Sequence, residues 1–142
     1  MTIRYLLDTN IVSAPMAKHP DPNIVQHLEE RGPECAIAAP VWHELTYGCL
    51  RLPRGSRRAA LEDYLNDVVR ASFTILPYDE TAATWHGLER ARLEALGRPA
   101  PYVDSQIAAI AHANSLVVVT VNTKDFAAFT GLKVENWSKR RK

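Results

Sequence analysis

Short apolar runs alternate along this chain with longer segments whose apolar residues recur at helical spacing. Such a run, bounded by polar residues or proline, is typical of a buried strand. Four runs meet this description, at residues 3–7, 35–39, 73–76 and 116–121, and a last extended piece covers 133–135. Strands that alternate with helices in this way predict an α/β domain, with a central, mostly parallel sheet of four to five strands flanked by helices.

The segments between the runs carry helix signals. Pro40 suits the first turn of one helix, and Asp79 suits the N-cap of another. The run at 116–121 is the most hydrophobic in the chain, and we expect it to form a central strand that is buried on both faces. Apolar residues at a spacing of about 3.6 predict helices over the ranges 24–28, 41–50, 60–68, 82–96 and 103–111.

The length of 142 residues suits a single domain, and no repeat or linker divides it. The apolar run that begins at Ile3 ends at Asp8, which is too short for a signal peptide or a membrane span. Cys35 and Cys49 form no C-x-x-C pair, so we do not expect a metal site built on thiolates. These features predict a reduced, soluble, cytoplasmic protein that has no membrane partner.

Acidic and amide side chains are expected at one edge of the sheet. In open α/β sheets, ligands bind outside the carboxyl ends of the strands. Asp8 directly follows the first run, and Asn122 and Asp125 follow the fourth. Asp104 lies in the first turn of its predicted helix, and Glu44 lies early in another. Both helices are otherwise apolar, and an ionised carboxylate is costly to bury without a partner.

Two interpretations compete for these acids. Asp8 and Asp104 stand where carboxylates stabilise helix N-termini, as Asp79 does, so capping accounts for any one of them taken singly. Glu44 is less easily explained as a cap, because it lies several residues past the start of its helix. In the other interpretation four carboxylates converge and repel one another, and a hard divalent cation relieves the repulsion. These four are Asp8, Glu44, Asp104 and Asp125.

Four segments of the chain stand out together: LLDTNIVS at 6–13, VWHELTYG at 41–48, VDSQIAA at 103–109 and TVNTKDF at 120–126. Taken together, they resemble PIN-domain nucleases, and in particular the VapC-type toxins of bacterial type II toxin–antitoxin pairs, including their FitB-like branch. Each segment is weak alone, but their order and spacing are specific, and the likeness extends from Ile3 to about Trp137. It implies a PIN domain over residues 1–138 and a basic C-terminal tail at 139–142.

The resemblance implies a catalytic metal pocket that holds Mg²⁺, with Mn²⁺ able to substitute, and that hydrolyses RNA phosphodiester bonds. Asn10 and Thr120 would be polar supports beside it. Some relatives carry the fourth acid where this chain has Asn122, so it stays open whether Asn122 or Asp125 completes the site. The implied catalytic and metal-binding residues are Asp8, Glu44, Asp104 and Asp125.

The resemblance also implies partners. It predicts a cognate antitoxin, typically a small DNA-binding protein, together with an RNA substrate, a homodimer and a toxin–antitoxin hetero-oligomer. Exposed apolar residues on the helices after Asp21 and Ser56 could form the dimer interface. The alternative is a non-catalytic PIN-like module that binds RNA or protein, for which the uncharged Asn122 leaves room.

Basic residues are concentrated in two stretches. Arg51, Arg54, Arg57 and Arg58 fall within eight residues that contain no acid, and Lys139–Lys142 closes the chain. Such runs form either a solvated face or contacts to RNA phosphates. The two stretches hold eight of the seventeen Lys and Arg residues, so the net charge of +1 conceals an acidic remainder. A near-neutral total is therefore compatible with a nuclease that combines an acidic pocket with local basic strips.

Other candidate sites are weaker. His43 and Glu44 begin like the zinc-binding H-E-x-x-H motif, but Tyr47 stands where the second histidine is required. Trp42 and Trp85 could stack on bases, but we expect them to pack in the core, because a tryptophan buries a large area.

Overall fold

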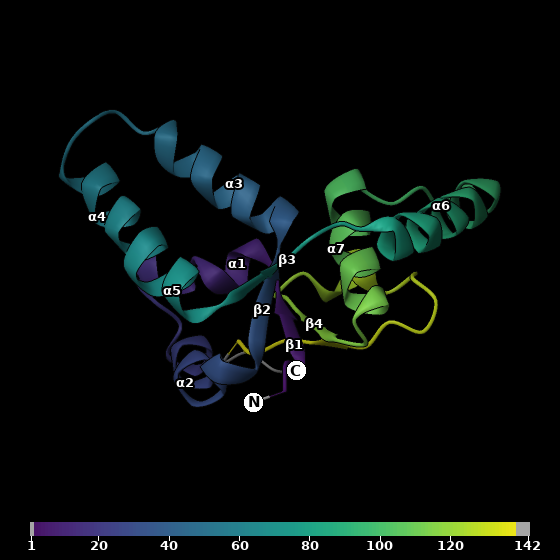
Figure 1. The fold of residues 1–142 in the computed structure, drawn as a ribbon, viewed down its shortest axis with the longest axis horizontal. Coiled ribbons are helices and arrows are strands. Elements are labelled where there is room, and N and C mark those ends of the chain that lie inside the picture. Colours follow the sequence, from purple (N-terminus) through teal and green to yellow (C-terminus); the bar gives the residue numbers. More distant parts are fainter. Residues whose placement is uncertain (1, 139–142) are drawn as a thin grey trace.

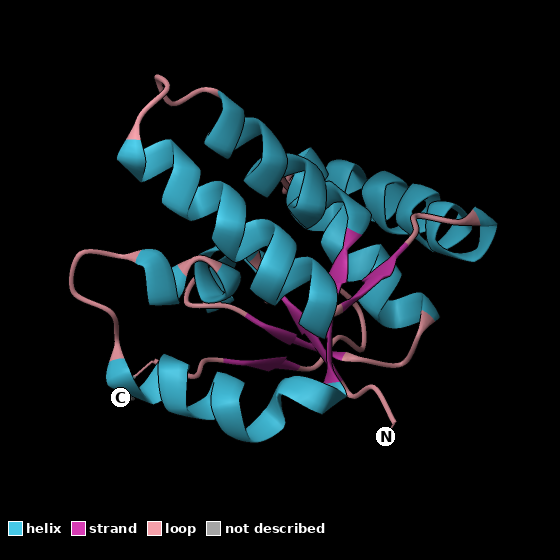
Figure 2. Cartoon of the chain, turned by 60° about the vertical axis from the view of Figure 1, so that its left-hand side comes forward, coloured by secondary structure: helices cyan, strands magenta, loops and turns pink. Residues whose placement is uncertain are grey.

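Five short strands form one fully parallel sheet in the computed structural model, which describes residues 2–138 (Figures 1 and 2). The strand order is β3-β2-β1-β4-β5, and each adjacent pair is parallel. This confirms the predicted α/β fold. The middle strand is β1, whereas the most hydrophobic run supplies its neighbour β4. The strands are β1 (Tyr5–Leu7), β2 (Cys35–Ala38), β3 (Thr74–Leu76), β4 (Val117–Val119) and β5 (Val134–Glu135).

Helices cover both sides of the sheet, with α3, α4 and α5 to one side and α6 and α7 to the other (Figure 1). The helix predicted over 60–68 is longer, because a π-helical segment at Leu65–Val69 joins α4 to α5. Short 3₁₀ turns cover Ala14–Met16, Gly32–Glu34 and Thr123–Phe126. The helices are α1 (Thr9–Val12), α2 (Pro22–Arg31), α3 (Ala39–Leu50), α4 (Ser56–Tyr64), α5 (Arg70–Ser72), α6 (Glu80–Ala95) and α7 (Tyr102–Ala113).

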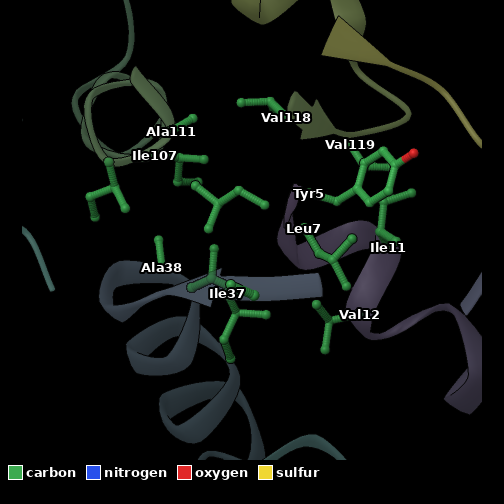
Figure 3. Close-up of a cluster of buried hydrophobic side chains, with 14 of the residues drawn as sticks. Tyr5, Leu7, Ile11, Val12, Ile37, Ala38, Ile107, Ala111, Val118 and Val119 are labelled. Atoms are coloured by element: carbon green, nitrogen blue, oxygen red, sulfur yellow. The ribbon is translucent and has the colours of Figure 1, made fainter. Parts of the chain in front are cut away.

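The hydrophobic core lies on both faces of the sheet. Leu7, Ile37 and Val119 are fully buried on three neighbouring strands, and Ile11 of α1 and Ile107 of α7 pack around them (Figure 3). Because helices cover both faces, the strands are continuous apolar runs rather than alternating ones.

Two tryptophans and both cysteines pack in or against the core. Trp42 and Trp85 are half-buried and pack against it, as expected. Cys35 and Cys49 are free and buried, and burial raises the pKa of the Cys35 thiol to about 12. Within residues 2–138, no helix is long and apolar enough to cross a membrane.

The strand register positions the candidate site. Leu7 is the register partner of Val119, and each is the last residue of its strand. Asp8 and Thr120 therefore follow two neighbouring parallel strands and emerge side by side at the carboxyl edge of the sheet. Of the predicted basic stretches, the tail Lys139–Lys142 lies outside the described residues.

Candidate active site

Asp8 is held by hydrogen bonds to both of its carboxylate oxygens, and it is only 7% exposed. Oδ1 accepts a 2.8 Å bond from the backbone N–H of Thr9, which makes Asp8 the N-cap of α1. Oδ2 accepts a 2.8 Å bond from the Thr120 hydroxyl and a 3.4 Å bond from the side-chain amide of Asn10. The capping interpretation is thus confirmed for Asp8, but it explains only one of the two oxygens.

Thr120 and Asn10 connect Asp8 to the segment after β4. Thr120 is fully buried, and its Oγ1 accepts a 3.0 Å bond from the backbone N–H of Asn122. Asn10 donates to the same oxygen across 3.4 Å and accepts a 3.2 Å bond from the backbone N–H of Val121. This network satisfies the buried Thr120 hydroxyl and holds the Asp8 carboxylate in one orientation. The structure therefore places both predicted supports beside Asp8.

Asp104 lies in the first turn of α7 and is half-buried. The cap position of this helix is taken by Pro101, so Asp104 itself is not the N-cap. Burial, as the largest cause, and the negative charges of Asp8 and Asp125 together raise the pKa of the Asp104 carboxyl to about 6. Asp8 and Asp125, which come from distant segments of the chain, therefore lie close enough to Asp104 for their charges to act on it.

Asp125 and Asn122 belong to one turn. Asp125 is exposed in the 3₁₀ turn after β4, and its backbone N–H donates a 3.0 Å bond to the carbonyl of Asn122. Asn122 is joined in turn to Thr120 through its own backbone N–H. The turn is thus tied to the network around Asp8. We call Asp8, Asp104 and Asp125 the acidic cluster.

Glu44 stands apart from the acidic cluster. It is exposed on α3, which packs against α7, whereas the charges that raise the pKa of Asp104 come from Asp8 and Asp125. Among residues 2–138, no three His, Cys, Asp or Glu side chains lie close enough together to hold a metal ion by direct contact. The chain therefore presents three neighbouring acids and a fourth on an adjacent helix, rather than a closed cage of ligands.

The arginine stretch covers the loop from α3 to α4, which holds Arg51 and Arg54, and the first turn of α4, which holds Arg57 and Arg58. This loop lies away from the sheet (Figure 1). Arg51, Arg54 and Arg57 are exposed. Arg58 is half-buried, and its guanidinium bonds the carbonyl of Leu52 at 3.3 Å and pairs with Glu62 at 3.6 Å. Three of the four predicted RNA-binding arginines are therefore exposed to solvent, and the fourth joins α4 to the loop before it.

Sequence reasoning missed two polar contacts of this fold, one made by the half-buried Tyr64 and one by the buried Glu89. The Tyr64 hydroxyl donates a 2.6 Å bond to the carbonyl of Val12, which ties α4 to the helix that Asp8 caps. Glu89 on α6 pairs with Arg92 at 2.8 Å and accepts a 2.9 Å bond from the backbone N–H of Thr130. These partners lie dozens of residues away in the chain, except for Arg92. Only the Glu89–Arg92 spacing of three residues on a helix could have indicated a pair.

The chain is similar to known proteins over most of its length. The family model described as PIN domain matches residues 5–132. The tRNA(fMet)-specific endonuclease VapC of Shigella flexneri is 32% identical over 137 residues, which cover 96% of this chain and 99% of that protein. Toxin FitB of Neisseria gonorrhoeae is 32% identical over 126 residues, which cover 87% of this chain and 91% of that protein.

The fold is also similar to a solved structure. The crystal structure of FitAcB from Neisseria gonorrhoeae contains a chain that superposes with a TM-score of 0.86 and is 30% identical. The match covers 93% of this chain and 96% of that one.

Proposed function

This chain belongs to the PIN-domain family of the VapC and FitB toxins, and on that premise we propose that it is a Mg²⁺-dependent endoribonuclease, the toxin of a type II toxin–antitoxin pair. The observation that supports this most is the acidic cluster at the carboxyl edge of the sheet. Asp8 is preorganised there by Thr120 and Asn10, and its charge acts on Asp104. Capping α1 would need only one of the Asp8 oxygens.

The donor set fits a hard divalent cation. Carboxylate oxygens are the ligands that Mg²⁺ prefers, and Mg²⁺ keeps several waters while it binds through one or two carboxylates and the substrate phosphate. An open group of acids suits such an ion, because the waters fill the remaining positions. Mn²⁺ accepts the same class of oxygen ligands. We assign Asp8, Asp104 and Asp125 to this site, with Glu44 contributing from α3.

The roles of the residues follow from the network. Bound Mg²⁺ would neutralise a phosphate and lower the pKa of a bound water. Asp8 keeps one orientation because Thr120 and Asn10 both donate to its Oδ2. One acid of the cluster accepts the proton of the attacking water. The exposed Arg51, Arg54 and Arg57 would contact RNA phosphates beyond the reacting bond.

The partners follow from the relatives. FitB is named a toxin, and a solved structure that is 27% identical to this chain is described as a member of the VapBC family of toxin–antitoxin systems from Mycobacterium tuberculosis, so we propose an antitoxin partner for this chain. The expected homodimer stays a prediction. The two helices assigned to the dimer interface, α2 and α4, border an apolar groove of about 590 Å³. Light scattering of the purified chain measures the mass of the particle in solution and so tests the dimer. Side chains that line this groove include Val25, Leu28, Tyr64, Val68 and Phe73.

The decisive experiment compares two aspartates that both cap helices. Asp79 caps α6 through a 3.0 Å bond from the N–H of Ala82 and is not part of the acidic cluster. The purified chain should cleave RNA with Mg²⁺ and stop when EDTA is added. We expect Asp8→Asn to reduce the cleavage rate by at least about 100-fold, the scale of a single electrostatic group in an active site. Asp79→Asn should keep the rate.

Full activity of Asp8→Asn would contradict the proposal, because capping would then be its whole role. If the unaltered chain cleaves no RNA and binds no divalent cation in titration calorimetry, the non-catalytic PIN-like binding module is the better description.

A further inference from the structure

Three side chains that can stack on planar groups follow one another along the exposed side of α3. His43, Tyr47 and Arg51 are spaced four residues apart, so they share one face of the helix. The ring centroids of His43 and Tyr47 lie 6.3 Å apart, with the planes inclined by 39°. The guanidinium carbon of Arg51 lies 5.5 Å from the centroid of the Tyr47 ring. We call these three residues the α3 ladder.

The fold does not need the α3 ladder for its stability. The side of α3 that packs on the sheet is formed by Val41, Leu45 and Cys49, which are buried. Tyr47 is 55% exposed on the other side. An aromatic residue that keeps most of its surface in water contributes little to the core. The aromatic ring and its cation are therefore available for a ligand.

The position of the α3 ladder connects two parts of the proposed active site. The helix begins directly after β2, at the carboxyl edge of the sheet where the acidic cluster lies. Glu44 lies between His43 and Tyr47 in the sequence. At the other end, Arg51 begins the loop that carries the exposed Arg54 and leads to the exposed Arg57 at the start of α4 (Figure 1). With a rise of 1.5 Å per residue, the ladder extends about 12 Å from its first residue to its last.

We propose that the α3 ladder is a stacking track for the unpaired bases of single-stranded RNA, leading from the basic loop to the acidic cluster. This inference rests on the proposed ribonuclease function and names the form of its substrate. Every base has a π-face, so aromatic rings beside a basic strip bind single strands with little sequence preference. Arginine planes stack on bases in the same way. A track of about 12 Å accommodates roughly three bases at a stacking distance of 3.4 Å.

A second tyrosine provides a matched control. Tyr102 on α7 is also 55% exposed, and the guanidinium carbon of Arg90 lies 5.8 Å from its ring centroid. Its ring lies against His86 of α6, at 5.2 Å between centroids, and not on α3. Tyr47→Leu and Tyr102→Leu thus remove the same chemical group from equally exposed positions, whereas Tyr47→Phe keeps the stacking ring.

The test measures the affinity of each variant for a short, unstructured, fluorescein-labelled oligoribonucleotide by fluorescence anisotropy in EDTA, where no cleavage occurs. We expect Tyr47→Leu to weaken binding about tenfold, within the range for the loss of one base–aromatic stack. Tyr47→Phe and Tyr102→Leu should bind like the unaltered chain. A duplex of the same sequence should show no loss with Tyr47→Leu.

Unchanged affinity of Tyr47→Leu would overturn the track, and so would an equal loss with Tyr102→Leu. The ribonuclease proposal would stand in both cases if the chain still cleaves RNA with Mg²⁺. If Tyr47→Leu changes the oligomeric state of the chain in solution but not its affinity for RNA, this face is a protein contact and the track is overturned as well. If the unaltered chain neither binds nor cleaves RNA, both proposals fail.

Discussion

The hydroxyl of Thr120 donates a 2.8 Å hydrogen bond to Oδ2 of Asp8, although the two residues are 112 positions apart in the chain. They meet because β1 and β4 are parallel neighbours whose last residues are in register. Each side chain therefore emerges one step past its strand, at the edge where parallel sheets bind ligands. The bond also makes Thr120 the link between Asp8 and the turn that carries Asp125.

We expect Thr120→Val to impair both stability and cleavage. The substitution keeps the shape of the side chain but leaves a buried carboxylate oxygen without its shortest bond. The loss of a hydrogen bond to a charged group costs about 1.5–3 kcal/mol, which denaturant unfolding measures. Thr120→Ser retains the hydroxyl and should behave like the unaltered chain. A valine variant that cleaves RNA at the full rate would show that Asp8 needs no orientation by Thr120.

Glu44→Gln should reduce cleavage without reducing stability. Glu44 is exposed on α3 and caps no helix, so the loss of its charge has little effect on folding. The charge of Glu44 affects cleavage only if it acts together with the acidic cluster. Cleavage rates and thermal unfolding measured on the same samples separate the two effects. Glu30→Gln, at an exposed position on α2, is the control and should alter neither quantity. Equal cleavage by both variants would remove Glu44 from the site.

Acid should destabilise the fold through Glu89. A hydrogen bond from Arg92, helped by one from Thr130, lowers the pKa of the Glu89 carboxyl from its ordinary value of 4.5 to about 2. Because the folded-state pKa is the lower one, the unfolded chain takes up the proton first. The stabilisation is complete above about pH 4.5 and is lost as the pH falls toward 2.

The variant Glu89→Gln should be less stable by about 2 kcal/mol at neutral pH and should show a weaker pH dependence in this window. Glu94→Gln removes an exposed ion pair with Arg90 on the same helix, and such pairs contribute little. Unfolding curves collected from pH 5 down to pH 2 compare the two variants. The same pH dependence in both would exclude Glu89 as the source.

The Tyr64 hydroxyl should stabilise the fold by about 1 kcal/mol, as typical hydrogen bonds do. It donates to the carbonyl of Val12 across 2.6 Å, and burial raises its pKa to about 12. Tyr64→Phe leaves that carbonyl without this donor, so we expect a lower unfolding midpoint in urea. Tyr102→Phe removes an exposed hydroxyl and should leave the midpoint unchanged. Equal midpoints for the two variants would mean that water replaces the Tyr64 bond.

Much of the fold could be predicted because it depends on local patterns. The apolar runs that end at Leu7 and after Val119 are strands because helices bury both of their faces, and such burial requires continuous apolar sequence. Asp79 could be assigned as a cap because capping involves only neighbouring residues. The order of the strands in the sheet could not be predicted in this way, since hydrophobicity does not distinguish the middle strand from the strand beside it.

The sequence by itself determined the fold class and the residue types of the candidate site, because periodicity and the position of acids after strands are properties of short segments. The tertiary structure alone decided which groups meet. It joined Thr120 to Asp8 through the register of β1 and β4, and it brought the charge of Asp125 to Asp104 while leaving Glu44 exposed on α3. It also gave two arginines of one stretch different roles, because Arg58 bonds the carbonyl of Leu52 whereas Arg51 is exposed. Distances between side chains from distant segments depend on how strands align and helices pack, and no local pattern encodes them.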